Sequence, residues 1–115
     1  MISPFWYGPA AREDWIEGAG GTPIRTFGWW VEDPRGRVQI THGFSEHMGR
    51  YAELAGALNE AGWSVFGHDH RGHGESGGRR GVLESFDDLV TDLARTREAA
   101  DTLAPGPGDP VLLGH

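Results

Sequence analysis

The alternation of short apolar runs with helical patterns constrains the fold of this chain more than any other feature of its sequence. Apolar runs occupy residues 38–41, 63–69 and 111–113, and each has the length of a buried strand. Two segments of helical periodicity, residues 48–61 and 85–103, lie between them. Strands that are connected through helices run parallel, and helices then cover both faces of their sheet. We therefore predict an α/β fold with a mostly parallel central sheet.

The two predicted helices have recognisable ends and apolar stripes. Gly62 follows the first helix as a C-terminal cap, and Ser85 opens the second helix with Asp88 as its capping-box partner. The first stripe consists of Tyr51, Leu54, Ala55, Leu58 and Ala61, and the second of Phe86, Leu89, Val90, Leu93, Ala100 and Leu103. Each stripe is predicted to face the sheet.

The part of the chain before residue 38 divides into a lead-in and a first strand. Prolines and a cluster of glycines interrupt residues 1–21, which we expect to be irregular. Residues 22–32 are rich in β-branched and aromatic side chains and predict a strand. The proline and glycine of residues 33–36 predict a turn after it. Residues 22–115 are thus predicted to belong to one domain.

Chemically versatile side chains gather where the predicted parallel strands end. Residues 42–44 (His-Gly-Phe), 68–70 (His-Asp-His) and 114–115 (Gly-His) follow the three apolar runs. Ligands of open α/β sheets bind beyond the carboxyl ends of the strands. Five of the six histidines lie at or just beyond these ends, so we expect the chemistry of the protein there.

The segment "PVLLGH" at residues 110–115 matches the first half of a nucleophile elbow, G-x-S-x-G. In that motif Gly114 is the first glycine, His115 is the variable residue, and the position after His115 is the nucleophilic serine. The motif needs small residues because strand and helix approach closely around a strained nucleophile. A strand that merely ends in Gly-His is the alternative interpretation.

The segment "THGFSEHMGRY" at residues 41–51 suits an oxyanion hole. Gly43 would let the backbone turn so that the N–H of Phe44 points into the crevice, and the following helix N-terminus would add a positive dipole. His42 and Gly43 would then support the oxyanion loop. An ordinary strand-to-helix turn with a packed histidine is the alternative.

The histidines also permit a metal-site interpretation. A metallohydrolase could draw its ligands from His42, His47, His68 and His70. The alternative is structural, with Asp69 and Arg71 holding a glycine-rich loop across the top of the sheet. The chain has no cysteine, which excludes a thiolate zinc site, a disulfide and a cysteine nucleophile.

Charge and hydropathy exclude several partners and locations. The net charge of −7, with dispersed acidic residues, argues against a nucleic-acid partner, which needs clustered positive charge. The N-terminal segment lacks the basic start and apolar core of a secretion signal. No apolar run approaches the roughly 18 residues of a membrane span. We therefore expect a cytoplasmic protein.

Three motifs together resemble those of one enzyme family. "HGFSEHMGRY", "VFGHDHRGHGESGG" and "PVLLGH" occur in the order and at the spacing found in monoacylglycerol lipases and lysophospholipases, which are α/β-hydrolases grouped with the serine aminopeptidases. The resemblance covers roughly residues 24–115. It implies an α/β-hydrolase fold in which the strands at residues 38–41 and 111–113 are neighbours. Residues 22–115 would be the N-terminal part of one such domain, incomplete at its C-terminal end.

The resemblance assigns roles residue by residue. Phe44 matches the position whose backbone N–H forms half of the oxyanion hole. One family signature, which would brace this loop, comprises Glu46, His47, Arg50 and Tyr51. A second signature, in the glycine-rich loop, also has an architectural role and comprises Asp69, Arg71, Gly72, Gly74 and Ser76. Gly114 and His115 match the nucleophile elbow. The family's triad acid and histidine follow the serine in the chain, so no histidine of this sequence is assigned as catalytic.

The expected activity is hydrolysis of a carboxylic ester in monoacylglycerol or a related lipid, by a Ser-Asp-His triad and without a metal or cofactor. Lysophospholipase or general carboxylesterase activity is the alternative within the family, and a metallohydrolase or a non-catalytic fragment is the alternative outside it. The expected partners are the lipid ester and the rest of the same polypeptide, whose lid would touch a membrane surface transiently. Because residues 111–113 would form an open apolar strand, we expect that this segment does not fold alone.

Overall fold

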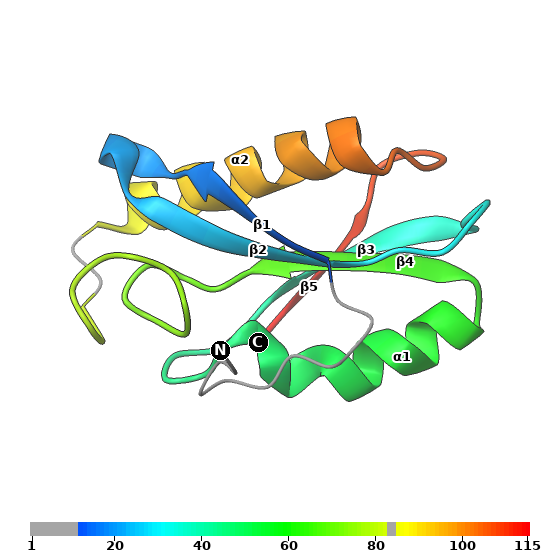
Figure 1. Cartoon of the computed structure of the whole chain (residues 1–115), viewed down its shortest axis with the longest axis horizontal. Coiled ribbons are helices and arrows are strands. Elements are labelled where there is room, and N and C mark those ends of the chain that lie inside the picture. Colours follow the sequence, from blue (N-terminus) through cyan, green and yellow to red (C-terminus); the bar gives the residue numbers. More distant parts are fainter. Residues whose placement is uncertain (1–11, 83–84) are drawn as a thin grey trace.

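A five-stranded sheet forms the centre of the computed structural model, which describes residues 12–82 and 85–115 (Figure 1). The strands lie in the order β1-β2-β4-β3-β5, with bounds β1 Arg12–Glu17, β2 Pro23–Trp29, β3 Gly36–Thr41, β4 Trp63–His68 and β5 Val111–Gly114. β3 pairs in parallel with both β4 and β5, whereas β2 pairs antiparallel with β1 and with β4. The predicted parallel unit is confirmed, inside a sheet that is mixed as a whole.

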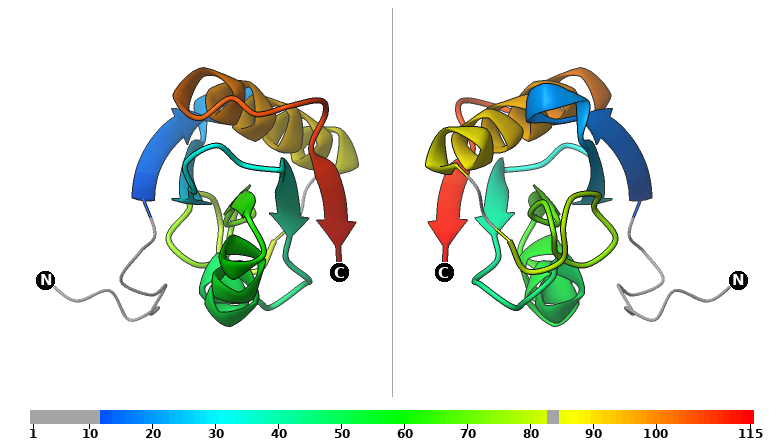
Figure 2. Two further views of the ribbon diagram at one scale, coloured as in Figure 1. Left: turned by 90° about the vertical axis from the view of Figure 1, so that its right-hand side faces the viewer. Right: turned by 90° about the vertical axis from the view of Figure 1, so that its left-hand side faces the viewer.

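Helices cover both faces of the sheet, as predicted. α1 (Ala52–Glu60) follows a 3₁₀ turn at Met48–Tyr51 and lies on one face, while α2 (Phe86–Leu103) lies on the other (Figure 2). Gly62 has a φ of 93°, so the predicted glycine cap after α1 is confirmed. None of the helices in the described ranges is long and apolar enough to cross a bilayer.

The main apolar core lies between the sheet and α1. It consists of Phe27, Trp29, Val38, Ile40, Met48, Ala55 and Val65, with Tyr51, Ala52, Leu58 and Trp63 packed against it. Full burial of a side chain such as Ile40 stabilises the fold by about 1.5–3 kcal/mol. The predicted stripe of α1 is confirmed in part, because Ala55 is buried and Leu58 packs on the core while Leu54 is exposed.

The face of the sheet that α2 covers carries several buried polar groups, and the predicted stripe of that helix is confirmed only in part, because Ala100 is buried while other members are exposed. Asp92, Thr96 and Ala100 are the buried residues of α2, whereas Phe86 is 76% exposed. Val90 and Leu103 are exposed as well. The reason lies in β3, where Val38 and Ile40 join the α1 core and the alternate residues face α2. There Gln39 donates to the Leu93 carbonyl and Arg37 donates to Asp101.

The expectation of an irregular lead-in over residues 1–21 is wrong for its second half, and residues 1–11 lie outside the described part. Arg12–Glu17 forms the edge strand β1, and Ala19–Gly21 forms a 3₁₀ turn. Contacts with the neighbouring strand stabilise β1, since Arg25 of β2 pairs with Glu13 and lies over the ring of Trp15. The predicted capping box of α2 is absent, because the Ser85 side chain caps no helix N–H.

Candidate active site

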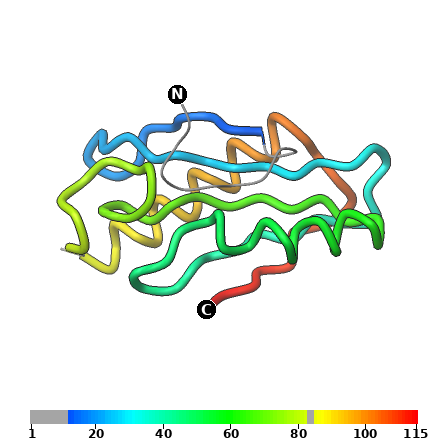
Figure 3. Tube along the Cα trace, turned by 60° about the horizontal axis from the view of Figure 1, so that its bottom comes forward, coloured from blue at the N-terminus to red at the C-terminus, as the bar shows by residue number. Residues whose placement is uncertain are grey.

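The carboxyl ends of three strands meet at one edge of the sheet and bring the predicted site segments together. Thr41 at the end of β3 pairs with His68 of β4 on one side and with Gly114 of β5 on the other. The backbone N–H of His115 also donates to the Thr41 carbonyl over 3.2 Å. Figure 3 shows the C-terminal segment reaching the loop that follows β3.

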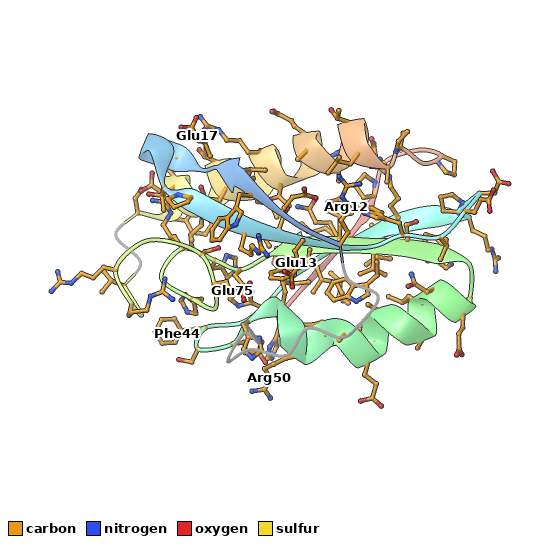
Figure 4. All side chains as sticks on the ribbon, viewed as in Figure 1. Arg12, Glu13, Glu17, Phe44, Arg50 and Glu75 are labelled. Carbon is orange, nitrogen blue, oxygen red and sulfur yellow. The ribbon has the colours of Figure 1, made fainter. Side chains whose placement is uncertain are left out.

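The loop after β3 leaves the backbone of Phe44 open. No hydrogen bond among the described residues engages the Phe44 N–H. The side chain of Phe44 is 66% exposed (Figure 4). Its ring makes an edge contact with that of His73, and the two ring centroids are 5.3 Å apart. The loop is closed by a bond from the Glu46 N–H to the Gly43 carbonyl, and Ser45 makes the bend with a φ of 63°.

Gly43 is needed for space rather than for an unusual backbone conformation, which corrects the sequence argument. The described residues with positive φ include Ser45 and eight glycines but not Gly43. A Cβ atom on Gly43 would lie 2.8 Å from Nδ1 of His115 and 2.9 Å from Oε1 of Glu46. A side chain at this position would therefore collide with the two residues that connect the loop to β5.

Two histidines, the buried His42 and the half-buried His70, hold the loop from behind. His42 donates from Nδ1 to the Gly43 carbonyl over 2.8 Å and accepts the N–H of His70 on Nε2 over 2.9 Å. His70 donates from Nε2 to the His42 carbonyl over 3.0 Å. Burial lowers the pKa of His42 to about 3 and also lowers the pKa of His70. Both rings are thus neutral at pH 7, and each has a defined tautomer.

Three of the four histidines considered for a metal lie close together, with ring centroids 4.3 Å apart for His42 and His70 and 5.1 Å apart for His68 and His70. His42 uses both ring nitrogens in hydrogen bonds, and His47 accepts the Gly49 N–H on Nδ1. Within residues 12–82 and 85–115, no group of three metal-binding side chains has a geometry that could hold an ion. His68 is fully buried, and burial holds its pKa well below the usual value.

The glycine-rich loop after β4 is fixed by Asp69 and Arg71, in line with the structural interpretation. The buried Asp69 carboxylate accepts the N–H of Met48 over 2.7 Å and the N–H of Glu75 over 2.8 Å. Ser76 donates to the Asp69 carbonyl over 2.6 Å. Gly72 and Gly74 both have positive φ, and a Cβ on Gly74 would lie 2.1 Å from Asp69 Oδ2. These residues therefore shape the loop.

Sequence reasoning missed the partner of Arg71, which is Asp92 on α2. Asp92 is fully buried and also accepts the N–H of Ala19 over 2.8 Å. The signal was present in the spacing, because Asp92, Thr96 and Ala100 form their own line at four-residue intervals. An apolar stripe alone does not reveal this line, because two of its three members are polar.

Beside the elbow segment lies an open cavity of about 400 Å³. It is lined by Thr41, Glu46, Arg50, Tyr51, Leu113, Gly114 and His115. Glu46 is its central polar group, since Oε1 accepts from the Gly43 N–H, the Tyr51 hydroxyl and His115 Nδ1. Bonds from His115 and then from Gly43 lower the pKa of Glu46 to about 2, so the carboxylate is ionised at neutral pH.

With this arrangement established, similarity to known proteins identifies the family. Residues 32–115 match the family described as "Serine aminopeptidase, S33". The chain belongs to the serine aminopeptidase S33 family. The resemblance drawn from the three motifs is thereby confirmed, and with it the α/β-hydrolase fold.

Individual members of the S33 family and related structures resemble the chain over most of its length. The monoacylglycerol lipase of Mycolicibacterium smegmatis is 45% identical over 77 residues, which are 66% of this chain and 28% of that protein. The human monoglyceride lipase is 43% identical over 84 residues, 71% of this chain and 27% of that protein. The structure of a thermostable carboxyl esterase from Bacillus coagulans superposes with a TM-score of 0.73 at 25% identity, covering 93% of this chain and 36% of that one. The chain thus spans less than a third of the length of these two curated lipases.

Proposed function

We propose that this chain forms the oxyanion-loop and elbow part of a serine ester hydrolase of the monoacylglycerol lipase type. The observation that carries the proposal is the direct pairing of β3 with β5, which sets the Phe44 loop beside the Gly114–His115 end. A serine at the position after His115 would then lie next to the open N–H of Phe44. The family membership and the two similar lipases support the same activity.

The proposed mechanism is acyl transfer through a covalent intermediate. The serine attacks the ester carbonyl, the Phe44 N–H donates to the oxygen as it gains charge, the alcohol leaves, and water then releases the fatty acid. The rest of the polypeptide would supply the second oxyanion donor and the triad acid and histidine. The role of this chain is to present one donor on a rigid loop. Loss of one such donor typically costs 10²–10³-fold in kcat.

The proposed substrate is a monoacylglycerol, on the strength of the two lipases that the chain resembles. The Phe44 ring is exposed and would offer an apolar surface to an acyl chain. Lysophospholipids and small esters are the finer alternatives to be compared in the same assay. A cytoplasmic location, and transient contact with a lipid surface through a lid, are part of this proposal.

The test is the intact mass of the complete gene product before and after a fluorophosphonate probe. We expect one covalent adduct, located on a serine directly after His115, and hydrolysis of monoacylglycerol that EDTA leaves unchanged. Replacement of that serine by alanine should abolish both labelling and hydrolysis. The proposal would be rejected if the protein did not react with the fluorophosphonate, or if the alanine variant still hydrolysed monoacylglycerol. Activity that EDTA abolishes and zinc restores would point to the metallohydrolase alternative instead.

A further inference from the structure

One carboxylate connects the two halves of the proposed site. Oε1 of Glu46 accepts the backbone N–H of Gly43 over 2.6 Å and faces Nδ1 of His115 at 2.9 Å. Gly43 directly precedes Phe44, the proposed oxyanion donor, and His115 directly precedes the position of the proposed nucleophile. The same oxygen atom therefore contacts the neighbours of both reacting groups.

The surroundings of Glu46 fix the orientation of its carboxylate. The Tyr51 hydroxyl donates to Oε1 over 2.9 Å, and Arg50 Nε lies 3.5 Å from Oε2. The Glu46 side chain is only 15% exposed, although it lies beside an open cavity. A side chain held by four neighbours has little rotational freedom, so it can transmit a defined position from one segment to the other.

The contact does not arise from the sheet itself. The residue pairing of β3 with β5 ends at Thr41 and Gly114. Beyond this pair, two contacts join the segments among the described residues: the bond from the His115 N–H to the Thr41 carbonyl, and the contact between the Glu46 side chain and His115. Gly43 has no side chain, and a Cβ there would occupy the space of this link.

We propose that Glu46 is a positioning residue that sets the distance between the Phe44 N–H and the nucleophile by holding Gly43 and His115 together. The proposal rests on the proposed function, because it gives Glu46 a task in ester hydrolysis rather than in loop bracing alone. Glu46 touches no reacting atom. It acts through the loop and the elbow, and its removal should let the two move apart.

The experiment compares Glu46→Ala and Glu46→Gln in the complete gene product. Misplacement of a reacting group by about 1 Å can cost on the order of 10²-fold in rate. We therefore expect Glu46→Ala to lower kcat about 10- to 100-fold with KM nearly unchanged. Glu46→Gln retains an oxygen acceptor for Gly43 but loses the charge, so it should recover part of that loss.

A second readout separates positioning from simple bracing. Hydrogen–deuterium exchange, followed by mass spectrometry, reports on residues 42–47 and on residues 112–115 separately. A connection between the segments predicts faster exchange in both of them for Glu46→Ala. Faster exchange in residues 42–47 alone, or a kcat within about twofold of the wild type, would overturn the proposal. Glu60→Gln, an exposed glutamate at the far end of α1, is the matched control and should change neither readout.

The two proposals can fail separately. Wild-type protein that neither reacts with the fluorophosphonate nor cleaves esters would reject the proposed function, while the exchange measurement would still decide whether Glu46 connects the two segments. If Glu46→Ala does not fold, the near-isosteric Glu46→Gln carries both measurements. Active wild-type enzyme with unchanged kcat and exchange in Glu46→Gln would then reject the positioning role.

Discussion

Arg71 and Asp92 face each other through two hydrogen bonds, from Nε to Oδ2 over 2.8 Å and from Nη2 to Oδ1 over 2.9 Å. The pair joins the glycine-rich loop after β4 to the middle of α2. Arg71 also donates to the Ala19 carbonyl, so three segments that are distant in the sequence meet at one guanidinium. A planar guanidinium suits this task because it can bind a carboxylate and a carbonyl at once.

Removal of the buried carboxylate should destabilise the protein strongly. Asp92→Ala leaves the Arg71 charge without its main partner, and breaking a buried ion pair from one side typically costs about 3–5 kcal/mol. We expect a fall of this size in the free energy of unfolding, measured by urea denaturation followed by circular dichroism. Glu98→Ala, an exposed position on the same helix, should change that free energy by no more than about 0.5 kcal/mol. Equal effects of the two variants would contradict the structural role of Asp92.

Two glycine-to-alanine variants should shift stability in opposite directions. Gly74 has a φ of 49°, and an added Cβ would lie 2.1 Å from the buried Asp69 carboxylate, so Gly74→Ala should destabilise by about 1–3 kcal/mol. Gly56 lies exposed in α1, and no atom of the described residues lies within 4 Å of its Cβ position. Gly56→Ala should therefore stabilise by about 0.4–1 kcal/mol. Thermal unfolding of both variants checks the signs, and a shift in the same direction would be the contrary result.

Acid should destabilise the protein in the range where free histidine titrates. Folding lowers the pKa of His42 from 6.5 to about 3, so between these values the unfolded state binds the additional proton. The contribution of such a histidine to the free energy of unfolding is then fully present above pH 6.5. It falls by about 1.4 kcal/mol per pH unit as the pH decreases towards 3. His68 and His70 change in the same direction because of burial.

Urea midpoints between pH 7 and pH 5 measure this slope, in a range above the titration of Glu46. His68→Phe replaces a fully buried ring by an apolar one of similar size and should make the slope shallower. A flat profile between pH 7 and pH 5 would show that these histidines are not buried in their neutral form. A slope that His68→Phe leaves unchanged would assign the effect to His42 and His70 instead.

Gly43→Ala should impair hydrolysis more than it impairs folding. Among the described residues, the added Cβ would meet only the ends of two side chains, Glu46 and His115, and these can shift only by breaking the bonds that hold them. That movement breaks the contact between the loop and the elbow, and we expect kcat to fall at least tenfold, since small misplacements are costly in the transition state. The melting temperature should change by no more than a few degrees. Steady-state kinetics and a thermal melt on one preparation test both statements.

Residues 1–115 produced as a separate polypeptide should associate through β5. Val111, Leu112 and Leu113 are each exposed by more than 40% on an open sheet edge, and such edges pair with other chains. We expect oligomers in gel filtration and strong binding of a hydrophobic dye. Leu112→Lys introduces an edge charge and should reduce both. A monomeric peptide that binds no dye would contradict this expectation.

The order of strands and helices from β3 onward, and the segments at the edge of the site, could be predicted from local patterns in the sequence. Apolar runs, helical periodicity and the glycine after α1 are local signals, and each was interpreted correctly because short-range geometry dictates it. The resemblance in the three motifs identified the family for the same reason, since residues at fixed spacing carry it. The positions of Phe44, Asp69 and Gly114 were therefore predictable, although their roles in hydrolysis remain proposals.

Only the tertiary structure decided which residues meet across the fold. β1 exists because β2 supplies its hydrogen bonds and Arg25 its ion pair. α2 presents Asp92, Thr96 and Ala100 to the sheet, where Gln39 of β3 and Arg71 of the loop after β4 bind polar groups of the helix. Glu46 and His115 are 69 residues apart in the chain, and no local sequence pattern predicts their contact. Such partners are fixed by packing and burial, whose free energy depends on the whole arrangement of strands and not on neighbouring residues.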